Sequence, residues 1–395
     1  MVTKIHFTLD LEDIKEQIEG SPLESTLKAA TTMALNQLMK KEQEEFIRAK
    51  FHEQSEQRQG SRNGYYTRSL LTSAGKLILN VPRVRDAEDE FSVSIFEKYE
   101  RIDQAFILSM IEMVVNGVST RNVEKIVQHC CGNRVSKSVV SDLCKRLDPI
   151  VDEWRNRTLE KEKYRFIFVD AMYIKVRELD RVVSKAVHIA TGVRQDGHRE
   201  VLGIHLSKGE SQASWEAFFE SLKSRGLSTP ELIISDAHAG IKAAAQSCFT
   251  GVPWQRCYFH LTRNIFQAFP KKGAAKVREQ VRDIFNAPTI DLARERKRIV
   301  FENYEQDNKF KKGLAILDDA FDDATQYFQF DVHPKGRLRT TSGLERLNQE
   351  VRKREKTIKI FPNEESAIRL IGTILMDLDA DYKTKRSPVI TDIKK

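Results

Sequence analysis

The stretch Arg165–Val176 reads Arg-Phe-Ile-Phe-Val-Asp-Ala-Met-Tyr-Ile-Lys-Val, and it decides the fold class. Phe166–Val169 is an unbroken run of aromatic and β-branched residues, which is typical of a strand buried on both faces. Asp170 ends this run, where a carboxylate is costly unless it is paired or bound to a metal. Aspartate is also common at helix N-caps and in turns, so Asp170 alone does not identify a site.

A second strand repeats the same pattern. The segment Glu231-Leu-Ile-Ile-Ser-Asp236 is again short, apolar and closed by an aspartate. Open α/β sheets bind their ligands at the carboxyl ends of the strands. We therefore expect Asp170 and Asp236 to converge at one edge of a sheet.

The segments around these two strands predict the order of the core. Three strands come first, then a helix, a strand, a helix and a fifth strand. The predicted elements are strands 165–176, 182–190 and 199–206, helix 211–224, strand 232–235, helix 240–247 and strand 254–259. This order is that of the ribonuclease H-like fold, so the sequence predicts an α/β protein with a mixed sheet.

Charge is distributed unevenly along the 395 residues. The net charge is +8, with 40% hydrophobic and 31% charged residues and a pI near 9.1. Residues 261–300 hold ten Lys/Arg against four acidic residues, and residues 335–359 hold nine against three. Localised positive charge suits a polyanion-facing surface, although a solvated helix face remains the alternative. The DNA contacts predicted here are Arg263, Lys271, Lys272, Arg337 and Arg339.

The N-terminal part predicts two further DNA-binding elements. Residues 61–100 contain two strand-like runs around a turn, and an ordinary hairpin is the alternative to a DNA-binding one. The hairpin residues predicted to contact DNA are Arg62, Tyr65, Arg68, Arg83 and Arg85. Residues 101–160 predict short helices with Gly-containing turns, either a helix-turn-helix or a structural three-helix unit. Its predicted recognition helix exposes Lys137, Ser138, Lys145 and Arg146, with Val139, Val140, Leu143 and Leu147 facing inward.

A third acidic residue comes from a predicted helix near the C-terminus. Glu345, Asn348 and Arg352 recur at i, i+3 and i+7 in residues 342–356, so one helical face presents them together. An isolated glutamate is usually a surface residue, and Glu350 and Glu355 are rivals nearby. We choose Glu345 because amide and guanidinium groups accompany it.

Three carboxylates of this kind suit metal-dependent phosphoryl transfer. They favour two Mg²⁺ or Mn²⁺ ions, roughly 3.5–4 Å apart. No Gly-Lys-Ser/Thr phosphate loop is present, so ATP hydrolysis is not supported. Cys257 and His260 have a ligand-like spacing, and Cys248 and His238 are near in sequence, so zinc is a second possibility.

The motifs together resemble the Mutator-type bacterial insertion-sequence transposases, which carry a DDE catalytic triad. The resemblance runs from about residue 62 to 381. It is carried by Arg62-Asn-Gly-Tyr-Tyr66, Val81-Pro-Arg-Val-Arg85, Gly117-Val-Ser-Thr-Arg121, Trp154-Arg-Asn-Arg157, Asp170-Ala, Ser235-Asp-Ala-His-Ala-Gly240, Gln255-Arg-Cys-Tyr-Phe-His-Leu-Thr-Arg-Asn264 and Glu345-Arg-Leu-Asn348. Each motif alone is weak, but their common order is specific.

The resemblance implies that Asp170, Asp236 and Glu345 are the catalytic and metal-binding triad. It implies active-site support from Cys257 and His260, with a basic residue at Arg352. It also implies that the protein cuts and joins the terminal inverted repeats of its own element and target DNA, as a homodimer. Five unpatterned cysteines and the lack of a signal peptide predict a cytoplasmic protein, which in a bacterium would associate with the nucleoid.

Two other functions stay open at this point: a transposase-derived DNA-binding regulator without catalysis, and a structure-specific nuclease of the same fold. The expected organisation has seven parts: an N-terminal helical arm (1–60), a basic hairpin (61–100), a helix-turn-helix (101–160), the first part of the core (161–262), a helical insertion (263–335), the last part of the core (336–383) and a disordered tail (384–395).

Overall fold

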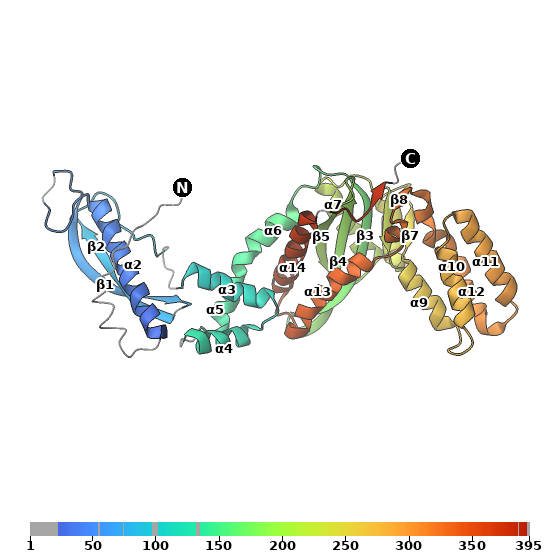
Figure 1. Cartoon of the computed structure of the whole chain (residues 1–395), viewed down its shortest axis with the longest axis horizontal. Coiled ribbons are helices and arrows are strands. Elements are labelled where there is room, and N and C mark those ends of the chain that lie inside the picture. Colours follow the sequence, from blue (N-terminus) through green and yellow to red (C-terminus); the bar gives the residue numbers. More distant parts are fainter. Residues whose placement is uncertain are drawn as a thin grey trace. The chain divides into compact units, whose positions relative to one another are not determined.

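The computed structural model describes residues 23–53, 56–73, 75–96, 102–131, 135–385 and 387–392. Residues 1–22 of the predicted N-terminal arm (1–60) lie outside this range. The chain divides into two compact units, Met1–Cys144 and Lys145–Lys395 (Figure 1). No helix in the described part of the chain is long and apolar enough to cross a membrane.

A long helix and a two-stranded hairpin begin the first unit. Helix α2 (Leu23–Ile47) packs against antiparallel strands β1 (Ser61–Thr72) and β2 (Gly75–Arg85). Leu77, Leu79 and Val81 alternate into their core, which confirms the periodicity expected of a half-buried strand.

Three short helices follow: α3 (Gln104–Val115), α4 (Thr120–Cys131) and α5 (Lys137–Cys144). The Ser119 hydroxyl accepts a hydrogen bond from Asn122 N at 3.3 Å and so caps the start of α4. Two expectations for the third helix are wrong. Val139 is 38% exposed rather than buried, and Lys145 and Arg146 lie in the 3₁₀ turn η1 (Lys145–Leu147), because α5 ends earlier.

A five-stranded mixed sheet forms the centre of the second unit. Its order is β5-β4-β3-β6-β7, with β4 antiparallel to β3 and β5, and with β3, β6 and β7 parallel. The strands are β3 (Tyr164–Glu178), β4 (Arg181–Arg194), β5 (Arg199–Ser207), β6 (Leu232–Ser235) and β7 (Trp254–Arg256). The predicted strands are confirmed, except that the fifth stops at Arg256 instead of residue 259.

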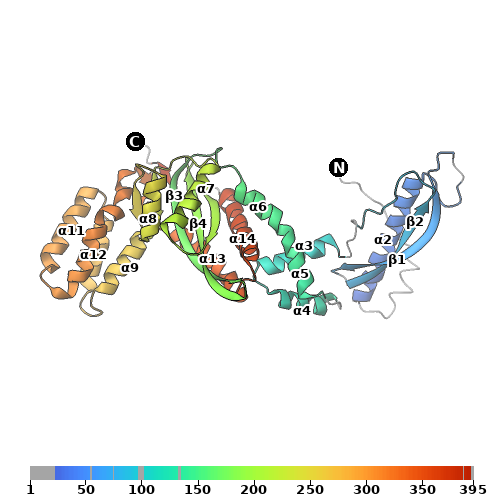
Figure 2. The ribbon, with the colours of Figure 1, turned by 180° about the vertical axis from the view of Figure 1, so that it is seen from behind.

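Helices cover both faces of this sheet (Figures 1 and 2). Helices α7 (Gln212–Ser224) and α8 (Ala239–Cys248) bury Trp215 and Phe219 against one face. Helices α13 (Ser342–Ile358) and α14 (Glu364–Thr384) pack on the other, where Leu347 meets Met172 in one core. Since β3 side chains alternate between faces, Asp170 shares a face with Met172 and points toward α13.

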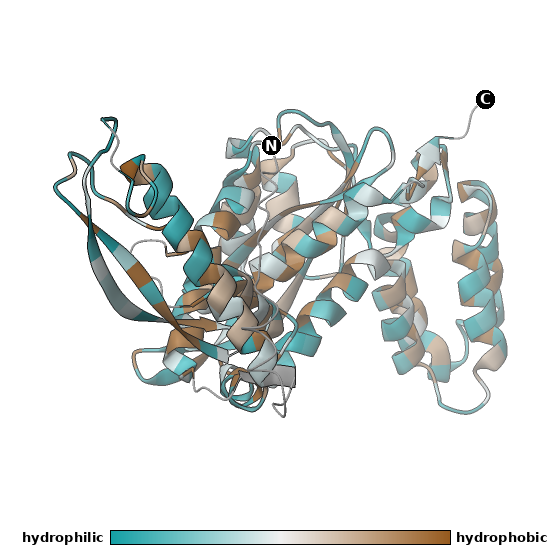
Figure 3. Cartoon of the chain, turned by 60° about the vertical axis from the view of Figure 1, so that its left-hand side comes forward, coloured by the Kyte–Doolittle hydropathy of each residue, from teal (hydrophilic) through white to brown (hydrophobic). Residues whose placement is uncertain are grey.

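Four helices separate β7 from α13. They are α9 (Tyr258–Ala268), α10 (Ala275–Phe285), α11 (Ile290–Tyr304) and α12 (Asn308–Ala324), followed by the 3₁₀ turns η2 (Gln326–Gln329) and η3 (Lys335–Arg339). Their apolar residues form a core of their own, and hydrophobic and hydrophilic residues alternate along their ribbons (Figure 3). One buried amide joins the two ends of this segment: Gln255 donates to Ala324 O and accepts from Tyr327 N, both at 2.9 Å.

The predicted disordered tail is wrong for the residues that the structure describes. Strand β9 (Thr391–Asp392) pairs with β8 (Val332–His333), and Ile390 is 2% exposed in a core with Phe166. Arg165 also forms an ion pair with Asp392 at 2.6 Å. A single buried isoleucine and this pairing hold the segment, despite its polar composition.

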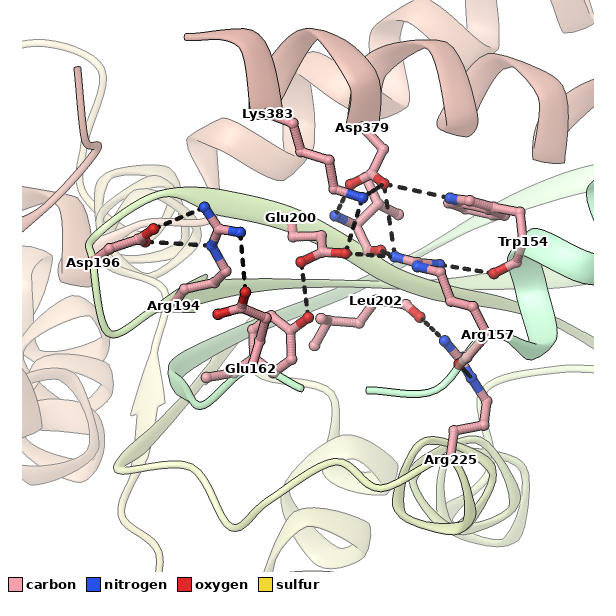
Figure 4. A network of polar contacts seen from close by, with 12 residues as sticks. Trp154, Arg157, Glu162, Arg194, Asp196, Glu200, Leu202, Arg225, Asp379 and Lys383 are labelled. Carbon is pink, nitrogen blue, oxygen red and sulfur yellow. Dashed lines mark hydrogen bonds and ion pairs between the residues drawn. The ribbon is translucent and has the colours of Figure 1, made fainter. Parts of the chain in front are cut away.

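A buried polar network joins α6 (Asp148–Asn156) to β5 and α14 (Figure 4). Glu200 and Asp379 are 5% and 2% exposed, and both form ion pairs with Arg157 and Lys383. Asp379 also accepts from Val201 N at 2.7 Å and Trp154 Nε1 at 3.4 Å. The Trp154–Arg157 motif is therefore engaged inside the fold.

Candidate active site

Two neighbouring parallel strands bring Asp170 and Asp236 together. Phe168 of β3 pairs with Ile234 of β6, and each aspartate follows its strand's paired residue by two positions. Asp170 lies within the long strand β3, whereas Asp236 directly follows the end of β6. The convergence expected from the sequence is therefore present.

Among the described residues, Asp170 has hydrogen-bond donors but no basic partner at hydrogen-bond distance. Its Oδ2 accepts from Asn348 Nδ2 at 2.8 Å, and its Oδ1 accepts from Ala171 N at 2.9 Å. Burial, and next the carboxylate of Asp236, raise the pKa of Asp170 from 3.8 to about 7. The charge of His260 opposes this rise. A carboxylate with such a pKa gains most from a bound cation.

Glu345 enters the same site from the first turn of α13. Its Oε1 lies 3.4 Å from His260 Nε2, at the start of α9. The hydrogen bond with Cys257 raises the pKa of His260 to about 9, and the charges of Glu345 and Asp170 add to this rise. Asn348, one helical turn after Glu345, bonds Asp170 and so joins α13 to β3.

Cys257 holds His260 and the start of α13 in place through its buried thiol. It is fully buried, and its Sγ accepts from Thr341 Oγ1 at 3.3 Å and Thr341 N at 3.5 Å. Burial alone would raise the pKa of Cys257, but hydrogen bonds from His260 and Thr341 outweigh burial and lower it. Cys257 thus connects α9 to the residue that precedes α13. Arg352, predicted to support the site, is exposed on α13.

Two buried oxygens at the site have no regular hydrogen bond within the described part of the chain. Oδ1 of Asn348 has no partner, and Oε1 of Glu345 has only the 3.4 Å contact with His260 Nε2. Among the described residues, however, no three His, Cys, Asp or Glu side chains are already arranged to hold one metal ion. Cys248, which the sequence suggested as a possible zinc ligand, interacts with Glu220 of α7.

Glu210 is a fourth acidic residue that the sequence reasoning missed. Its charge raises the pKa of Asp170. Burial raises the pKa of Glu210 itself, the charge of His238 opposes this and that of Asp236 adds to it. The sequence could have indicated Glu210, because it follows the end of the third strand at Ser207. That strand runs parallel to β3, so its end lies at the same edge of the sheet.

The predicted DNA-binding residues of the hairpin divide into two groups. Tyr65, Arg83 and Arg85 are exposed, and Arg83 lies 4.8 Å from the Tyr66 ring centroid. Both Arg83 and Arg85 line a groove of 1290 Å³, as does Arg68, which stacks on Phe96 at 4.0 Å. Arg62 is engaged within the fold: it donates to Ala49 O at 2.7 Å and Lys50 O at 3.2 Å.

The remaining predicted DNA contacts are mostly exposed. Lys137 and Ser138 border a cavity of 550 Å³ on α4 and α5. In the second unit, the predicted DNA contacts that are exposed are Lys145, Arg146, Arg263, Lys271, Lys272 and Arg337. Arg339 differs, because its guanidinium donates to Phe285 O at 2.6 Å and Asn286 Oδ1 at 2.9 Å, at the end of α10.

Comparisons with known proteins identify the family. The model of the transposase Mutator family matches residues 2–385. The transposase of insertion sequence element IS256 in transposon Tn4001 from Staphylococcus aureus is 50% identical, covering 96% of this chain and 97% of the relative. The transposase of IS406 from Burkholderia multivorans is 37% identical, covering 93% and 97%.

A solved structure is also similar, the Drosophila P element transposase strand transfer complex. It matches with a TM-score of 0.40 and 10% identity, over 70% of this chain and 92% of that chain. A likeness at this level carries no conclusion about the site. The family match over nearly the whole length is decisive, and the chain belongs to the Mutator family of transposases.

Proposed function

We propose that the chain is a Mg²⁺-dependent DDE transposase that binds the terminal inverted repeats of its insertion sequence. In this proposal Asp170, Asp236 and Glu345 are the catalytic residues for DNA cleavage and strand transfer. The observation that carries it is the meeting of Asp170 with Asp236 on adjacent strands and with α13 through Asn348. The transposase names of the relatives support the same activity.

We further propose that the core is ribonuclease H-like. The strand order β5-β4-β3-β6-β7, with only β4 antiparallel to the others, supports this proposal. So does the position of the two aspartates on β3 and after β6. The helical segment α9–α12 then separates the second aspartate from Glu345.

The residues of the site fit a divalent ion. Carboxylate and amide oxygens are the ligands that Mg²⁺ and Mn²⁺ prefer. Among the described residues, buried Oδ1 of Asn348 has no hydrogen-bond donor, and Oε1 of Glu345 has only the 3.4 Å contact with His260 Nε2. Burial and the charge of Asp236 raise the pKa of Asp170, and a bound cation would offset both. Asp170, Asp236 and Glu345 would hold the metal, which when bound activates the attacking oxygen and stabilises the leaving one.

The other residues of the site position these carboxylates. Asn348 Nδ2 donates to one oxygen of Asp170, and Ala171 N donates to the other. Together they fix the orientation of this carboxylate. His260 holds the Glu345 carboxylate, and Cys257 holds His260 and Thr341. We expect DNA contacts from the exposed basic residues of both units, and a homodimer on paired element ends.

The test is cleavage and joining of terminal-repeat DNA with Mg²⁺ or Mn²⁺. Wild-type protein should cut and join, whereas Asp170→Asn, Asp236→Asn and Glu345→Gln should each lose about 1000-fold in rate, ~4 kcal/mol of barrier. All three should still bind the DNA. Glu355→Gln on the same helix is the matched control and should keep wild-type activity.

Each result discriminates between functions. Full activity of Asp170→Asn or Glu345→Gln would overturn the triad. Binding without cleavage by wild-type protein would favour a DNA-binding regulator. Cleavage without joining would favour a structure-specific nuclease.

A further inference from the structure

A basic pocket lies on the side of α13 that faces away from the site. It has a volume of 610 Å³ and is lined from β5, η3, α13, α14 and the segment after α14. Its basic residues are Arg199, Arg337, Arg346 and Lys385. Glu350 also lines it, but that carboxylate is bound by Lys353 and Arg354 of its own helix, both at 2.5 Å.

Arg199 is the unusual member of the basic pocket. Only 8% of it is exposed, and its Nε has no hydrogen-bond partner among the described residues. Its guanidinium lies 5.1 Å from the ring centroid of Phe168. Burial lowers the pKa of Arg199, and the nearby charges of Arg346 and Arg337 lower it further. Tyr382 acts in the opposite direction and raises it. A buried cation beside other cations is unfavourable without an anion.

The first turn of α13 adds to this positive potential. The guanidinium of Arg199 packs against Gly343, where an added Cβ would come within 1.6 Å of Nη1. The N-terminal turn of a helix carries partial positive charge and attracts anions. A cation held at this end therefore points to a ligand that carries negative charge.

We propose that the basic pocket binds a phosphate group, which is a backbone phosphate of DNA if the function proposed above holds. Exposed Arg346 and Lys385 would receive the phosphate at the rim, with Arg199 at the base. Successive residues of a helix diverge by about 100°, so α13 presents Glu345 to the site and Arg346 to the pocket. A strand anchored here would be held by the same helix that carries the third acid.

The experiment measures binding of pyrophosphate and of a terminal-repeat duplex by titration calorimetry without divalent metal. The test variant is Arg346→Gln with Lys385→Gln. The matched control is Lys311→Gln with Lys312→Gln, which removes the same charge from the exposed face of α12. Arg199→Met provides a second test, with circular dichroism to check its folding.

We expect the test variant to bind pyrophosphate and duplex about tenfold more weakly, while the control stays within about twofold. The slope of log affinity against log salt should fall by about one, the value for one phosphate contact. Loss of pyrophosphate binding alone would support a phosphate site and assign it to a free phosphate ligand. Unchanged binding of both ligands would overturn the proposal.

This outcome is separable from the proposed function. Binding is measured without metal and without turnover, so an inactive wild-type protein would still report on the pocket. Conversely, Asp170→Asn should keep its binding of pyrophosphate even though it loses cleavage.

Discussion

The second unit buries acidic side chains in two places that differ in their partners. Glu200 and Asp379 are surrounded by Arg157 and Lys383, with every oxygen near a donor (Figure 4). Asp170 has only amide donors and lies beside another carboxylate. Burial acts to raise the pKa of both Asp170 and Glu200, but Tyr164, Lys383 and Arg157 bring that of Glu200 below its usual value.

This difference shows which carboxylates serve the fold and which are reserved for a ligand. A buried charge that the protein neutralises itself is tolerated in the folded state, and removing its partner is strongly destabilising. A buried charge that it leaves without a counter-ion is maintained at a cost to stability, which suits a site that is completed by a cation. Three predictions can break or sharpen this comparison.

The largest effect is expected from the paired network. Arg157→Met should lower the free energy of unfolding by about 3 kcal/mol, because it leaves Glu200 and Asp379 buried with fewer donors. Urea denaturation measures this change. Arg155→Met is the control at the end of α6, two residues before Arg157, since the ion pair of Arg155 among the described residues is with Asp152, and it should change stability by about 0.5 kcal/mol or less. Equal effects of both variants would contradict a structural role for the network.

A smaller effect is expected from the pH dependence of stability, with opposite sign for substitutions of Asp170 and Glu200. The folded pKa of Asp170, about 7, exceeds its ordinary 3.8, so its favourable contribution is complete below pH 4 and is lost by pH 7. Asp170→Asn should therefore stabilise metal-free protein at pH 7 by about 2 kcal/mol, and not at pH 4.

Glu200 behaves in the opposite way, because its folded pKa is lowered. Its contribution is present above the ordinary pKa and is lost as the pH falls through the folded value. Glu200→Gln should thus destabilise the protein at pH 7 and lose this effect in acid. Unfolding curves between about pH 2 and pH 8 with a chelator measure both variants, because the Glu200 effect is lost only below its ordinary pKa of 4.5. Effects of the same sign would refute the contrast.

The smallest effect is expected at the surface. Arg298 bonds Glu295 and Glu302 on α11, an arrangement that also has one cation and two carboxylates. Because solvent screens exposed pairs, Arg298→Gln should leave the urea midpoint unchanged within error. A clear loss of stability would show that pairing, rather than burial, sets the strength of these networks.

Much of the core could be predicted from periodicity alone. The apolar run before Asp170 and its repeat before Asp236 identified two parallel strands, because strands buried on both faces leave an unmistakable composition. The helical spacing of Glu345 and Asn348 likewise predicted one shared face. Local sequence patterns were sufficient to predict an element wherever that element buries a single row of apolar residues.

What depends on distant contacts could not be predicted. The fifth strand stops at Arg256 because Cys257 must turn inward to meet Thr341. The tail is ordered by Ile390, which fills a core made by residues far away in the sequence. Arg199, on the third strand, reads as an ordinary basic residue until tertiary packing buries it.

The buried amide of Gln255 has a consequence for how this family can change over time. It ties the point where the chain leaves the sheet to the point where it returns, and the four helices between them pack on one another. Helices could therefore be gained, lost or exchanged within that loop while the spacing of the acids stays fixed. Variation in this segment is then compatible with the site, provided that Gln255 keeps both hydrogen bonds at its base.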